Sequence, residues 1–162
     1  MIAGPPDTSA QGSPGPTATN RAVIRAACAA FRAAIEETIP RPVGLDAFPK
    51  GACGDTCEML ADFLRSRSLG DPTYVTGLSE DHARSHAWLE IDDLIIDITA
   101  DQFGDVEEQV IVTTDRSWHE SRFPSVGRHR PAGLAHWDGL THAEVEDYYS
   151  KLEKTLVFGV PS

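Results

Sequence analysis

Three residues whose types suit nucleophilic catalysis occur along the chain in the order Cys53, His86 and Asp97. A thiol becomes a strong nucleophile only as a thiolate, and both a helix N-terminus and an adjacent imidazole favour that form. Cys53 lies at the start of a helical pattern, and the other two residues lie in apolar segments typical of strands. The combination predicts a cysteine nucleophile with a histidine base that is oriented by a carboxylate.

The segments that carry His86 and Asp97 are expected to form one β-hairpin. Residues 86–91 and 94–99 are rich in Ile, Leu, Trp and Thr, and a two-residue Asp-Asp turn separates them. The two side chains then become diagonal neighbours across the strands, roughly 7–8 Å apart at the backbone and within side-chain reach. A shift of the pairing by one residue would place them on opposite faces, so the predicted contact depends on this register.

Pairing of Ile91 with Leu94 assigns the hairpin side chains to two faces. One face carries His86, Trp88, Glu90, Ile95, Asp97 and Thr99. The other face is entirely apolar and carries Ala87, Leu89, Ile91, Leu94, Ile96 and Ile98. A carboxylate among β-branched neighbours is costly unless it has a partner, which makes Asp97 hard to explain as a chance residue.

The helix that presents Cys53 is expected over residues 53–66, with an apolar stripe of Cys57, Leu60, Phe63 and Leu64. Its start is open between two alternatives. Asp55 and Glu58 could form a capping box that places Cys53 just before the first turn, or Cys53 itself occupies that turn. In both cases the thiol lies near the positive end of the helix dipole.

The rest of the chain predicts a single domain over residues 20–162, after a flexible tail of residues 1–19 that is rich in Gly, Pro, Ser and Thr. The other expected elements are a helix from Asn20 to Pro40, strands at 73–76 and 109–113, an irregular stretch at 114–140, and a helix from Thr141. This order indicates an α+β fold with helices against one face of a largely antiparallel sheet.

Composition excludes several classes of partner. The chain of 162 residues has a formal net charge of −11, which disfavours binding to nucleic acid or to an anionic membrane. It contains no apolar run of the about 20 residues that a transmembrane helix needs. The 3 cysteines have no disulfide-scaffold spacing, so a reducing cytoplasm is the expected location, and Cys28 is expected to be a core residue.

Between residues 48 and 103 the chain resembles the transglutaminase-like branch of the papain-type cysteine enzymes. The resemblance is carried by Gly51-Ala52-Cys53 at a helix start, Gly70, the strand Tyr74-Val75-Thr76-Gly77, His86-Ala87-Trp88, and Asp97. It implies a papain-like fold with N-terminal helices packed on a small antiparallel sheet. It also implies thiolate attack on a peptide or protein amide, with no cofactor. The chain departs from the family at Gly54, where an aromatic residue is common.

The expected reaction is acyl transfer from an amide through a thioester on Cys53, with hydrolysis preferred because water is always present. The oxyanion needs preorganised donors, for which the Cys53 backbone N–H is the first candidate. Gln102 is a candidate second donor, and Trp88 is a candidate contact to the oxyanion or the substrate.

Two alternatives belong to other functional classes. Cys53, Cys57, His82 and His86 have spacings that could ligate zinc. The chain could instead be a catalytically inactive peptide-binding module, with a groove lined by residues of the stretch 114–140: Trp118, His119, Arg122, Phe123, Arg128, Arg130 and Trp137. An ordinary packed loop is the competing interpretation of that stretch, and the cluster Arg128-His129-Arg130 could bind a carboxylate or simply be solvated.

Overall fold

The computed structural model describes residues 18–127 and 129–158. It contains four α-helices and six strands within that range, which agrees with the predicted α+β class. The helices are α1 (Ala18–Glu37), α2 (Cys53–Ser66), α3 (Ser117–Arg122) and α4 (His142–Phe158). The strands are β1 (Thr73–Leu78), β2 (Ser85–Ile91), β3 (Leu94–Asp97), β4 (Ile111–Thr113), β5 (Ser125–Val126) and β6 (Arg130–Pro131). The predicted tail lies outside the described residues, apart from its last two, which begin α1.

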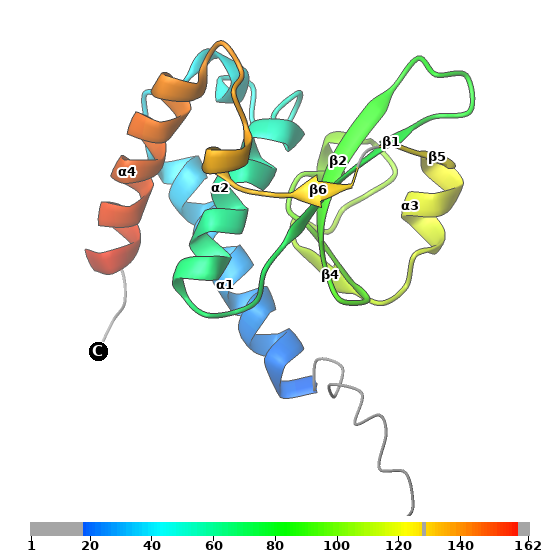
Figure 1. The fold of residues 1–162 in the computed structure, drawn as a ribbon, viewed down its shortest axis with the longest axis horizontal. Coiled ribbons are helices and arrows are strands. Elements are labelled where there is room, and N and C mark those ends of the chain that lie inside the picture. The colour runs from blue at the N-terminus through cyan, green and yellow to red at the C-terminus, as the bar shows by residue number, and fades with distance from the viewer. Residues whose placement is uncertain (1–17, 128, 159–162) are drawn as a thin grey trace, which may run out of the picture.

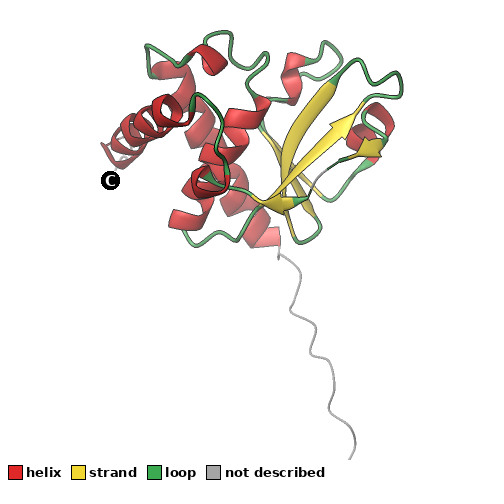
Figure 2. Ribbon diagram, turned by 45° about the horizontal axis from the view of Figure 1, so that its top comes forward, coloured by secondary structure: helices red, strands yellow, loops and turns green. Residues whose placement is uncertain are grey.

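The sheet is antiparallel throughout, with the strand order β4-β3-β2-β1-β5 and with β6 paired to β1. Helices α1, α2 and α4 lie together on one side of the sheet, and the short α3 lies on the other side (Figure 1). The same division between a helical layer and a sheet is visible after rotation of the molecule (Figure 2). None of the described helices combines the length and the apolar character that a membrane span requires.

The predicted hairpin register is confirmed. Ile91 pairs with Leu94, and the pairing continues through Glu90 with Ile95 and Leu89 with Ile96. Asp92 occupies the turn with a positive φ of 52°, a conformation that Asp tolerates better than most residues.

The two faces of the hairpin are buried in two separate apolar clusters. The apolar face lies in the main core between the sheet and helices α1, α2 and α4, where Phe31 stacks on Phe63 at a centroid distance of 5.0 Å. The face that carries Trp88 is covered by a second cluster, which consists of Val75, Trp88, Ile95, Phe103 and Phe123, with Trp118 packed against it. Three polar residues of this face, His86, Asp97 and Thr99, therefore lie inside the molecule.

A buried arginine on α1 ties down the chain segment that follows β3. Arg32 donates to the Ile98 carbonyl at 2.8 Å and forms two hydrogen bonds to the Asp101 carboxylate, at 2.6 and 2.7 Å. Such a two-pronged pair between guanidinium and carboxylate fixes orientation as well as distance. It holds the segment next to Asp97 against the helical layer.

The stretch 114–140 is more ordered than the sequence indicated. It contains α3, β5 and β6 in its described part, all of which are too short for a periodic pattern to reveal them. The Ser117 backbone N–H donates to Asp115 Oδ1 at 2.9 Å, which satisfies one unpaired donor at the start of α3. Strand β1 extends two residues beyond its predicted end, and β4 begins two residues later than expected.

Candidate active site

His86 and Asp97 lie side by side on neighbouring strands, as the predicted register requires. His86 Nε2 is 2.7 Å from Asp97 Oδ2, and both side chains are almost fully buried, with side-chain exposures of 0% and 1%. Because Asp97 is ionised, as its lowered pKa indicates, the proton of this hydrogen bond belongs to Nε2. The other ring nitrogen, Nδ1, is buried and forms no hydrogen bond to a nitrogen or oxygen atom among the described residues.

The Asp97 carboxylate is saturated with hydrogen-bond donors. Oδ1 accepts from the Thr99 backbone N–H at 2.9 Å and from the Thr99 hydroxyl at 3.4 Å, while Oδ2 accepts from His86 and from His119. Burial alone would raise the pKa of Asp97. The charge of His86 and the hydrogen bonds from His119 and His86 outweigh burial and hold that pKa well below its usual range.

His119 is the residue of this cluster that sequence reasoning did not place there. It comes from α3, is 1% exposed, and its Nε2 lies 2.9 Å from Asp97 Oδ2. The sequence named it only as a possible groove residue. The available signal was local: Asp115, a residue type that often precedes helices, comes four residues before His119.

Cys53 is the first residue of α2, so the second of the two predicted helix starts is correct. The preceding residue, Ala52, offers no side-chain cap, and the first backbone bond of the helix runs from Thr56 N to Ala52 O. The first-turn N–H groups therefore remain available beside the half-buried thiol. Asp55 lies inside the first turn and is not the cap, and burial and the nearby Glu58 raise the pKa of its carboxyl.

The environment of Cys53 favours the thiolate. Burial raises the pKa of the thiol. The His86 imidazole and the Ala87 backbone N–H lower it by more than burial raises it, so the pKa of Cys53 is below the ordinary value of 9.0. For His86, burial lowers the pKa, whereas the Asp97 carboxylate and then Cys53 raise it to about 9. The imidazole is therefore protonated at neutral pH and stabilises a neighbouring thiolate electrostatically.

The other two cysteines have the opposite character. Burial raises the pKa of Cys28 to about 12 and raises that of Cys57 well above its ordinary value. Both side chains lie in the main core, as the sequence indicated. Among the three thiols, Cys53 alone combines partial exposure with a lowered pKa.

The two candidate contact residues are both engaged within the fold. Gln102 accepts from the Gly51 backbone N–H at 3.3 Å and donates to the Thr99 carbonyl at 3.0 Å. It therefore links the loop before Cys53 to the end of β3, a placement that favours a positioning role. Trp88 is 1% exposed, and its indole N–H is donated to Glu90 at 3.0 Å, which favours packing over contact with a substrate.

The four zinc ligands expected from the sequence do not come together at one point. His82 is exposed in the turn between β1 and β2, and the four predicted ligands form no cluster. The one group of metal-binding residue types that the described chain brings together is His86, Asp97 and His119, whose donor atoms lie within 4.8 Å of one another. All three are buried, and the donor atoms already form two hydrogen bonds.

The groove that was expected along residues 114–140 is filled by packing. His119 and Phe123 are buried, Trp118 packs against the second cluster, and Trp137 packs against the main core. Arg130 forms an ion pair with Glu58, so the carboxylate that it binds belongs to the chain itself. Arg128 lies outside the described residues.

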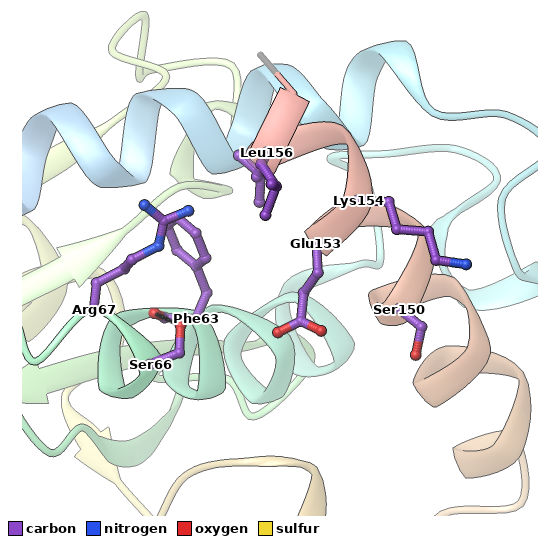
Figure 3. A pocket seen from close by; sticks show the side chains of 8 residues that line it. Phe63, Ser66, Arg67, Ser150, Glu153, Lys154 and Leu156 are labelled. Carbon is purple, nitrogen blue, oxygen red and sulfur yellow. Dashed lines mark hydrogen bonds between the residues drawn. The ribbon is translucent and has the colours of Figure 1, made fainter. Parts of the chain in front are cut away.

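One cavity lies away from the thiol, between the C-terminal halves of α2 and α4 (Figure 3). Its volume is about 670 Å³, and it is lined mainly by apolar groups, with Arg67 stacked over Phe63 and with Leu156 from α4. Its two hydroxyl groups, on Ser66 and Ser150, donate to carbonyls of their own helices. Hydroxyls bonded in this way are not activated, so the cavity offers no competing nucleophile.

No protein-family model, no curated protein and no solved structure matches this chain. The chemistry of the site is therefore judged from its geometry.

Proposed function

We propose that this protein is a cysteine-dependent acyl-transfer enzyme that acts on an amide bond, with Cys53, His86 and Asp97 as its catalytic triad. The observation that carries the proposal is the buried 2.7 Å hydrogen bond between His86 Nε2 and Asp97. It leaves Nδ1 as the nitrogen that exchanges a proton at the thiol, which is the arrangement that thiol catalysis requires. The lowered pKa of Cys53 supports the same assignment.

In the acylation step, the Cys53 thiolate attacks the amide carbonyl carbon. A carbon–sulfur bond forms, and the carbonyl π electrons move onto oxygen. When this intermediate collapses, the carbon–nitrogen bond breaks and the departing nitrogen takes the proton from His86 Nδ1. The product is a thioester on Cys53 and a neutral amine.

Deacylation reverses the role of the histidine. Water attacks the thioester while His86 Nδ1 accepts its proton, and the intermediate then expels the Cys53 thiolate. An amine in place of water would give transfer instead of hydrolysis. We propose that the reaction is hydrolysis of a peptide or side-chain amide and that it needs no cofactor. We also propose a transglutaminase-like, papain-type fold. The proposed location is the cytoplasm, where reducing conditions keep a working thiol free.

Two groups hold the base in place. Asp97 accepts from Nε2–H and so fixes the tautomer that leaves Nδ1 facing the thiol. His119 donates to the same oxygen of Asp97 and so keeps that carboxylate ionised and oriented. His119 touches neither the thiol nor the substrate in this scheme and is a positioning residue.

A metal centre at His86, Asp97 and His119 is the second candidate, because their donor atoms lie within 4.8 Å of one another. A catalytic metal needs an open coordination position for substrate or water. These side chains have exposures of 0–2%, which favours the hydrogen-bonded triad over a metal catalyst. Metal analysis of the purified protein separates the two: a stoichiometric transition metal would favour the second candidate.

The proposal is tested by the rates at which iodoacetamide labels the three thiols at neutral pH, measured by peptide mapping. Cys53 is expected to react at least about tenfold faster than Cys28 or Cys57, because only its thiolate is favoured. His86→Ala is expected to slow labelling of Cys53, while Cys57→Ala serves as the matched control and leaves it unchanged. Equal labelling of all three thiols would contradict the proposal.

A further inference from the structure

Tyr74 brings a phenol to the first turn of α2. The side chain comes from β1, and a Cβ atom placed on Gly54 would lie 3.3 Å from the Tyr74 hydroxyl oxygen. Gly54 directly follows the proposed nucleophile, so the hydroxyl lies beside the peptide that joins the two residues. The absence of a side chain at position 54 is what gives the phenol this space.

The ring of Tyr74 is held in this position from its other side. The Arg130 guanidinium lies over the ring at 4.2 Å from its centroid, within the range of a cation–π interaction. Arg130 is in turn paired with the buried Glu58 of α2, which also accepts the Gly133 N–H at 2.7 Å. The phenol is therefore anchored to the same helix that presents the thiol.

The hydroxyl is available as a donor. Tyr74 is half-buried, and its hydroxyl forms no hydrogen bond within the described part of the chain. The hydroxyl oxygen is not fully buried, so it can be reached from solvent. Burial, followed by the nearby Cys57 and Cys53, raises the pKa of the phenol above its ordinary value of 10.0. The group therefore keeps its proton over the whole neutral range.

An acyl-transfer site needs two donors for the oxyanion, and the first turn of α2 supplies backbone N–H groups for one of them. Gln102, the candidate second donor from the sequence, uses its amide oxygen at Gly51 and one of its two N–H donors at Thr99, which holds it in a positioning role. We propose that Tyr74 is the second donor, with its hydroxyl donating to the oxyanion that forms when Cys53 attacks a carbonyl. This inference rests on the proposed function and adds a catalytic residue to it.

The test compares two reactions of the same thiol. p-Nitrophenyl acetate acylates Cys53 through an oxyanion and gives a burst of nitrophenolate, whereas iodoacetamide alkylates the thiol without forming an oxyanion. Tyr74→Phe keeps the ring beneath Arg130 and removes only the hydroxyl. We expect acylation to fall by about 10²-fold, the usual effect of removing one oxyanion donor, with alkylation unchanged within about twofold.

Tyr149→Phe is the control, because it also removes one phenolic hydroxyl, from a buried tyrosine of α4 that lies in the main core. It should leave both rates unchanged. If Tyr74→Phe retains full acylation, or slows acylation and alkylation equally, the role of Tyr74 as oxyanion donor is overturned. Cys53→Ala tests the proposed function separately, since a burst that persists in this variant would remove Cys53 as nucleophile.

Discussion

Replacing Asp97 by Asn creates a conflict that no orientation of the amide resolves. With its oxygen toward His86 and His119, the Asn NH₂ group would face the Thr99 N–H, which now donates to Asp97 Oδ1 at 2.9 Å. With the amide reversed, the NH₂ group would face two Nε2 atoms. His86 would then carry its proton on Nδ1 and could not accept one from the thiol.

The expected size of the loss in Cys53 reactivity follows from the pKa of His86. The pKa of His86 is raised from 6.5 to about 9, chiefly by Asp97, and at 1.36 kcal/mol per pKa unit this corresponds to about 3 kcal/mol in favour of imidazolium. Loss of that stabilisation lowers the population of the thiolate–imidazolium pair by about 10²-fold. The alkylation rate of Cys53 in Asp97→Asn is therefore expected to fall by about 10²-fold at pH 7.

The assay is the rate of iodoacetamide labelling of Cys53 between pH 5 and 10. The deficit should become smaller as pH rises toward 10, because a growing fraction of the thiol then ionises without help from His86. Asp105→Asn removes the same charge from an exposed carboxylate and should leave the profile unchanged. A labelling rate in Asp97→Asn that stays within about threefold of the parent at pH 7, with circular dichroism unchanged, would refute the reasoning.

Two further predictions concern the buried cluster. His119→Ala should lower the free energy of unfolding in urea by about 1–3 kcal/mol, because it removes a buried donor of Asp97, and His119→Gln should recover part of the loss through its amide N–H. In a Cys53→Ala background, the stability that His86 adds relative to His86→Gln should be complete below pH 6.5, the ordinary pKa of His86, and should decline as pH rises above that value, at a pH below about 9 because Cys53 no longer helps to raise the pKa of His86. At acid pH, the stability that Asp97 adds is present above its ordinary pKa of 3.8 and is lost as pH falls below that value. The stability added by the His86–Asp97 pair is therefore expected to be largest between about pH 4 and 6.5. Urea titrations at fixed pH values measure the free energy of unfolding for both predictions. A stability difference between the His86 and His86→Gln proteins that is independent of pH would contradict the second prediction.

The contact between His86 and Asp97 could be predicted because it depends on local rules. A two-residue turn and strict alternation leave one register that buries an apolar face, and that register places the two side chains on the same side. The start of α2 at Cys53 was one of two local alternatives. Both features depend on residues that are close in sequence, but local patterns were sufficient only for the hairpin register and left two starts open for α2.

His119 and Tyr74 could not be placed in the same way. The six-residue helix α3 is too short to show a period, and its docking beside β3 depends on contacts of Phe103, Phe123 and Trp118 that no local pattern encodes. The phenol of Tyr74 reaches Gly54 only because β1 lies beside β2 and α2 packs against β2. The residues that complete the site are thus determined by tertiary packing.

The second apolar cluster also corrects the interpretation of the polar face of the hairpin. Alternation separated Trp88 and Asp97 from the apolar face, but it could not show that a further layer covers them. Burial on both sides explains why Trp88 packs against its neighbours instead of facing a substrate. It also removes water from the hydrogen bond between His86 and Asp97, which strengthens that bond electrostatically.

Stability and reactivity depend on the same carboxylate. An ionised group that is buried as deeply as Asp97 is costly unless its lone pairs are satisfied, and four hydrogen bonds from Thr99, His86 and His119 satisfy them. Those donors come from β2, from the segment after β3, and from α3, so the helix on the far side of the sheet helps to hold the base that faces Cys53 from the near side. A substitution that loosens α3 should therefore lower thiol reactivity without touching any residue that meets the substrate.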